Sequence, residues 1–132
     1  MASSILLFTS LSLYEAPQEI TANVVIDGIY TSIKGILRNG RIVIPVYDFL
    51  EYLNDGIIVE NEQITLLHNG TTVILYINRY TAYINGMQHA MDTAAQIING
   101  ALFLPLRFVV ESFGYNIDFK YGIVFITSAL VL

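Results

Sequence analysis

The chain of 132 residues contains no cysteine and only two histidines, His68 and His89. The absence of cysteine excludes disulfides, thiolate nucleophiles and thiolate metal sites together, and it is compatible with any cellular compartment. Neither histidine has a second one at a metal-ligand spacing, and no phosphate loop, zinc motif or EF-hand pattern is present. We therefore expect no metal, no cofactor and no catalytic site. His68, beside an Asn-Gly turn, is predicted to be a solvated turn residue.

Charge is also scarce. Charged residues make up 13% of the chain and hydrophobic residues 55%, against about 25% charged in an average soluble domain. No apolar run reaches the ~20 residues that a membrane helix needs, so no membrane span is predicted. With so few charged residues, a small free-standing domain would expose a large apolar surface to water. We expect part of the surface to be covered by another copy or another protein.

Basic residues are few and scattered. The chain has six of them against eleven acidic residues, for a net charge of −5 and an isoelectric point near 4.7. Nucleic-acid binding needs a basic patch or stripe. A nucleic acid is therefore not an expected partner.

What the chain does have is an internal repeat. Asn39-Gly40 leads into a short apolar segment that ends at Pro45, and Asn99-Gly100 leads into one that ends at Pro105. Apolar residues then follow at i, i+3, i+4 and i+7, which places them on one face of a short helix beginning near the proline. These residues are Val46, Phe49, Leu50 and Leu53 in the first copy and Leu106, Val109, Val110 and Phe113 in the second, and Glu51 corresponds to Glu111.

Turn dipeptides divide the rest of the chain. Asp27-Gly28, Asn69-Gly70 and Asn85-Gly86 lie between β-rich segments and favour type I′ hairpins. Gly114 is predicted to end the second helix and residues 54–56 the first. The sequence thus predicts an α+β fold, mostly antiparallel β, with two tandem β-β-β-α-β-β repeats at 20–78 and 79–132 forming one compact domain.

Residues 1–14 carry no charge. Residues 5–13 alternate at period two, which predicts an extra N-terminal strand, and the proline-containing residues 15–19 form a linker. The same apolar run is also compatible with part of a signal peptide. The candidate self-assembly residues on this strand are Ile5, Leu7, Leu11 and Leu13.

Residues 97–114, Ile-Ile-Asn-Gly-Ala-Leu-Phe-Leu-Pro-Leu-Arg-Phe-Val-Val-Glu-Ser-Phe-Gly, carry a Pro-Leu-Arg motif with Glu four positions after the arginine. With the preceding Tyr83-Ile84-Asn85-Gly86, this segment resembles the copper amine oxidase N-terminal-like domain of bacterial secreted and cell-surface proteins. The resemblance spans residues 22–128. It implies a non-catalytic, stalk-like domain at the cell surface or outside the cell.

The chain departs from the pattern of this family in several places. Val59 and Phe119 stand where the family has tryptophan, and Tyr47 replaces the arginine of the first repeat. Only Arg107 and Glu111 therefore retain the Arg–Glu pair, which is expected to form an ion pair within the helix or a buried pair between helix and sheet. The three histidines and the quinone-forming tyrosine context of a copper amine oxidase are missing, so no enzymatic activity is predicted.

Two functions follow as hypotheses. The first is a non-catalytic extracellular structural module that self-associates, as a filament or surface-array subunit, through donation of the N-terminal strand to a neighbour. The competing interpretation folds that strand back onto its own sheet. The second function is binding to cell-wall polysaccharide, for which Tyr76, Tyr80 and Tyr83 form an aromatic cluster in the sequence.

Overall fold

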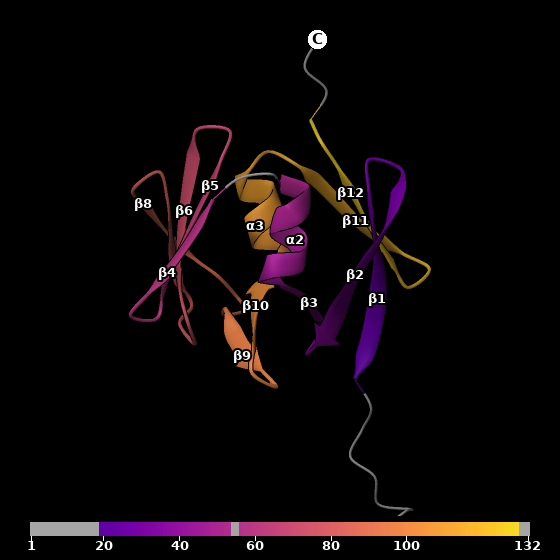
Figure 1. The fold of residues 1–132 in the computed structure, drawn as a ribbon, viewed down its shortest axis with the longest axis horizontal. Coiled ribbons are helices and arrows are strands. Elements are labelled where there is room, and N and C mark those ends of the chain that lie inside the picture. The colour runs from indigo at the N-terminus through magenta and orange to yellow at the C-terminus, as the bar shows by residue number, and fades with distance from the viewer. Residues whose placement is uncertain (1–18, 54–55, 130–132) are drawn as a thin grey trace, which may run out of the picture.

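A computed structural model of the chain describes residues 19–53 and 56–129. Within these residues the strands form a seven-stranded and a five-stranded sheet, with two short helices between them (Figure 1). Neighbouring described strands pair antiparallel except β1 and β12, which run parallel. The predicted α+β fold with mostly antiparallel strands is confirmed.

The seven-stranded sheet combines segments from both ends of the described chain. Its two outermost described strands are β11 and β9, and its central strands are β1, β2 and β3. In spatial order its strands are β11 (Asn116–Lys120), β12 (Ile123–Thr127), β1 (Ile20–Ile26), β2 (Ile29–Arg38), β3 (Arg41–Pro45), β10 (Ala101–Pro105) and β9 (Gln96–Ile98).

The five-stranded sheet is a meander in which each strand pairs with the next along the chain. Strands β4 and β8 are its edges among the described residues. Its members are β4 (Ile57–Glu60), β5 (Gln63–His68), β6 (Thr71–Tyr76), β7 (Thr81–Ile84) and β8 (Met87–Ala90).

The predicted hairpin turns are confirmed, and all share one backbone conformation. At each turn an Asx residue with φ near +50° precedes a glycine with φ near +80°, which an L-residue with a branched side chain adopts only at a cost. Five turns take this form: Asp27-Gly28, Asn39-Gly40, Asn69-Gly70, Asn85-Gly86 and Asn99-Gly100.

Both helices begin directly after the prolines, as the apolar spacing predicts. Helix α2 (Val46–Leu53) follows Pro45, and α3 (Leu106–Ser112) follows its N-cap Pro105. The described members of each apolar set are buried or partly buried. Gly114 follows the C-cap residue of α3 with φ +87°, which confirms it as the residue that ends this helix. Most of the predicted end of α2, at residues 54–56, lies outside the described residues.

The main core lies between the two sheets, where the helices pack. It combines side chains from both helices with side chains from both sheets, such as Val24 and Ile44 on one and Ile64 and Leu75 on the other. Each sheet draws strands from both predicted repeats. The division at residues 78 and 79 stays a prediction, as does the extra N-terminal strand with Ile5, Leu7, Leu11 and Leu13, which lies outside the described residues.

Candidate functional site

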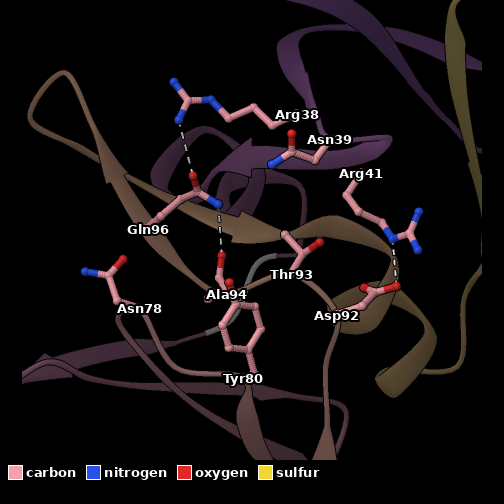
Figure 2. A pocket seen from close by; sticks show the side chains of 9 residues that line it. All are labelled: Arg38, Asn39, Arg41, Asn78, Tyr80, Asp92, Thr93, Ala94 and Gln96. Atoms are coloured by element: carbon pink, nitrogen blue, oxygen red, sulfur yellow. Dashed lines mark hydrogen bonds and ion pairs between the residues drawn. The ribbon is translucent and has the colours of Figure 1, made fainter.

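A cleft of about 310 Å³ opens where the two sheets meet. Three segments line it: the tip of the β2–β3 hairpin, the connection between β6 and β7, and residues 92–96 leading into β9 (Figure 2). Its lining residues are Arg38, Asn39, Arg41, Asn78, Tyr80, Asp92, Thr93, Ala94 and Gln96.

Backbone hydrogen bonds hold two of these segments together. The amide of Asn78 donates to the carbonyl of Ala95 at 2.7 Å, and that of Met91 donates to the carbonyl of Tyr80 at 2.7 Å. Ile77 and Ala95 also form a parallel bridge. Asn78 has φ +62°, a left-handed conformation that asparagine tolerates better than most residues. Main-chain hydrogen bonds thus hold the β6–β7 connection against residues 91–95.

Side chains on the rim are held by one another. Arg41 Nε lies 2.6 Å from Asp92 Oδ2. Arg38 Nη1 donates to Gln96 Oε1 at 3.5 Å, and Gln96 Nε2 donates to the carbonyl of Ala94 at 3.1 Å. Arg38 also pairs with Glu19, the residue just before β1. Both guanidinium groups are therefore matched by a carboxylate.

The tyrosine cluster predicted from the sequence is only partly assembled at this cleft. Tyr76 and Tyr83 pack edge-to-face with ring centroids 6.3 Å apart, and Arg79 lies over the Tyr76 ring at 5.4 Å. Of the three tyrosines, only Tyr80 lines the cleft, and its side chain is exposed.

The sequence motif residues occupy separate places. Asn39 is at the cleft and Gly40 beside it, whereas Asn99 and Gly100 form the β9–β10 turn. Arg107 Nη1 lies 3.6 Å from Glu111 Oε2 on the exposed face of α3, as an ion pair within the helix. Glu51 is exposed on α2.

The prediction for His68 was wrong. His68 is only 6% exposed, at the end of β5. Its Nε2 lies 2.9 Å from Tyr115 Oη, and its ring stacks on Tyr115 and meets the edge of Phe113. The residues around α3 fold over the end of β5 and bury the ring. Tyr115 is 47 positions away in the sequence, so its contact with His68 could not be predicted. Only the neighbouring turn was evident.

The donor set does not fit a copper site. His68 packs against aromatic rings and His89 lies on the exposed edge strand β8. In the described part of the chain no three His, Cys, Asp or Glu side chains are grouped so as to hold a metal ion. Neither described helix has the length and apolar content needed to cross a bilayer.

Comparison with known protein families identifies the family of this chain. A sequence model described as the copper amine oxidase N-terminal domain matches residues 25–125. The chain belongs to this family. Comparison with curated proteins and with solved structures found no match. The N-terminal domain of copper amine oxidases is a non-catalytic domain.

Sequence reasoning missed most of the cleft in this copper amine oxidase N-terminal domain. Arg41 and Asp92 are 51 positions apart, and Arg38 and Gln96 are 58 apart. Neither pair has a spacing that a motif search detects. The available signal is local: the polar segments Asn78-Arg79-Tyr80 and Asp92-Thr93 interrupt apolar strands.

Proposed function

We propose that this domain is a non-catalytic structural module that self-associates outside the cell or at its surface. The observation that carries the proposal is the edge of the five-stranded sheet at β4. The side chains of Ile58 and Val59 are 53% and 41% exposed there. Among the described strands β4 pairs with β5 alone, so its other side offers free backbone groups.

The edge at β11 is protected by charged side chains. On β11, at the edge of the seven-stranded sheet, Asp118 and Lys120 pair at 3.2 Å, and charges of this kind discourage strand addition. Strand β4 contains no lysine, arginine or proline, and its one charged residue, Glu60, is the last residue of the strand. Of these two edges, β4 is the one suited to receive another strand.

The strand we propose for this edge is residues 5–13 of a second copy. These residues are uncharged and mostly apolar. A strand added to an open edge gains main-chain hydrogen bonds and side-chain contacts on alternate residues. In Figure 1 the start of β1, which follows this segment, lies at the lower end of the right-hand sheet, whereas β4 lies in the left-hand sheet. The donated strand and the receiving edge are different surfaces, so the contact is head-to-tail, and it propagates as a filament when the rotation between copies does not close a ring.

The tandem repeat belongs to the same proposal. The order β3-α2-β4-β5 recurs as β10-α3-β11-β12, each beginning at an Asn-Gly turn. We propose that residues 20–78 and 79–132 are two copies of one unit, of which the first acquires β6 and the second β9.

Electron microscopy with light scattering on the full chain and on a chain lacking residues 1–14 tests the self-association. We expect fibres or large oligomers from the full chain and monomers from the shortened one. A monomeric full chain together with an unfolded shortened chain would show that the strand belongs to its own sheet and would overturn the proposal.

A substitution on β4 tests whether this strand is the one that receives the added strand. Ile58→Lys places a charge on β4, and we expect the full chain to remain folded but monomeric in light scattering. Ile29→Lys, at an apolar position on β2 that is 67% exposed, is the control and should assemble normally. Equal assembly of both variants would exclude β4 as the receiving strand.

A further inference from the structure

The cleft between the sheets is not used by strand addition at β4, and its side chains have a distinct chemistry. Three carboxamides, Asn39, Asn78 and Gln96, line it together with the hydroxyl of Thr93. Each carboxamide offers both donors and an acceptor, and the hydroxyl does the same. Groups with both capacities match a ligand that is rich in hydroxyls.

The charges in the cleft point to a neutral ligand. Arg41 is paired with Asp92, and Arg38 with Glu19. An anionic ligand would be repelled by the carboxylates of these pairs. A neutral ligand instead finds guanidinium and carboxylate groups that are already oriented by each other and remain exposed.

Tyr80 supplies an apolar surface. Its side chain is 60% exposed and extends from the β6–β7 connection toward residues 92–96 (Figure 2). An exposed aromatic ring beside fixed polar groups can pack on the C–H face of a pyranose while the rim binds the hydroxyls. Most lining side chains are exposed, so the cleft is open and suits part of a longer chain.

We propose that this cleft binds a neutral oligosaccharide made of pyranose sugars. Tyr80 packs on a sugar ring, and Asn78 and Gln96 bind hydroxyl or acetamido groups. The Arg41–Asp92 pair fixes the orientation of the oligosaccharide. The site differs from the predicted tyrosine cluster, because Tyr76 and Tyr83 lie outside it. This inference does not depend on self-association.

Titration calorimetry on the full chain tests it with three probes: the β-1,4-linked tetramer of N-acetylglucosamine, cellotetraose and tetragalacturonate. We expect at least one neutral tetramer to bind, and more tightly than tetragalacturonate. Tyr80→Ala should weaken that binding about tenfold. Tyr47→Ala, at a similarly exposed tyrosine on α2 that does not line the cleft, should leave it unchanged.

Asp92→Asn provides an independent readout. It keeps the shape of the side chain and removes the carboxylate that neutralises Arg41, so the affinity for tetragalacturonate should rise several-fold while circular dichroism shows an unchanged fold. The proposal is overturned if neither neutral tetramer binds, if the anionic tetramer binds the native chain more tightly, or if Tyr80→Ala and Tyr47→Ala bind alike.

Discussion

At the scale of single residues, His68 shows how tertiary contacts determine the role of a polar side chain. Near a hairpin turn it has the sequence context of a solvated residue, yet Phe113 and Tyr115 enclose it. The hydroxyl of Tyr115, 2.9 Å from the ring nitrogen, is one of the groups that compensate for burial of the imidazole.

Removing that hydroxyl should destabilise the domain. Tyr115→Phe keeps the ring stacked on His68 but deletes the hydrogen bond, and we expect the free energy of unfolding in urea to fall by about 1 kcal/mol. Tyr121→Phe, at a side chain that is 93% exposed, is the control and should have no effect. Equal stability of both variants would show that the contact contributes nothing.

At the scale of elements, helix α3 has one stabilising face and one solvated face. Leu106, Val109 and Val110 are fully buried against the sheets. On the other side Arg107 and Glu111 form an exposed ion pair at 3.6 Å, and pairs of this kind add little to stability. The family motif therefore combines a packing requirement with a surface pair of small energetic weight.

Two substitutions measure the contribution of each face to the stability of the domain. Leu106→Ala should lower the free energy of unfolding by about 2–5 kcal/mol, because it leaves a cavity between the sheets. Glu111→Gln should change it by less than about 0.5 kcal/mol. Thermal or urea unfolding measures both, and a large loss from Glu111→Gln would mean that the ion pair is a structural lock.

The helices and strands differ in how far they could be predicted from a single sequence. Asn-Gly and Asp-Gly turns and the i, i+3, i+4, i+7 spacing act over a few residues, so the hairpins and both helices were predictable. Strand β12 pairs with β1 from about one hundred positions away, and Arg41 meets Asp92 across 51 positions. Such partners are chosen by packing of the whole domain, so the sheet order and most of the cleft were not predictable.

At the scale of the whole molecule, the central claim is assembly by strand addition. Low charge predicts a partly covered exterior, and among the described strands β4 pairs on one side only and exposes Ile58 and Val59. The cleft lies elsewhere, at the junction of the two sheets. Assembly and saccharide binding are therefore expected to be separable by mutation, with Ile58→Lys affecting the first and Tyr80→Ala the second.

Cross-linking between copies tests that claim most directly, because the chain has no cysteine of its own. Leu11→Cys and Ile58→Cys chains, one of them isotope-labelled, are mixed with a short bismaleimide, and intact masses are measured. We predict a mixed dimer of the two variants, and none when Ile29→Cys replaces Ile58→Cys. Mixed dimers at equal yield in both mixtures, or in neither, would contradict strand donation to β4.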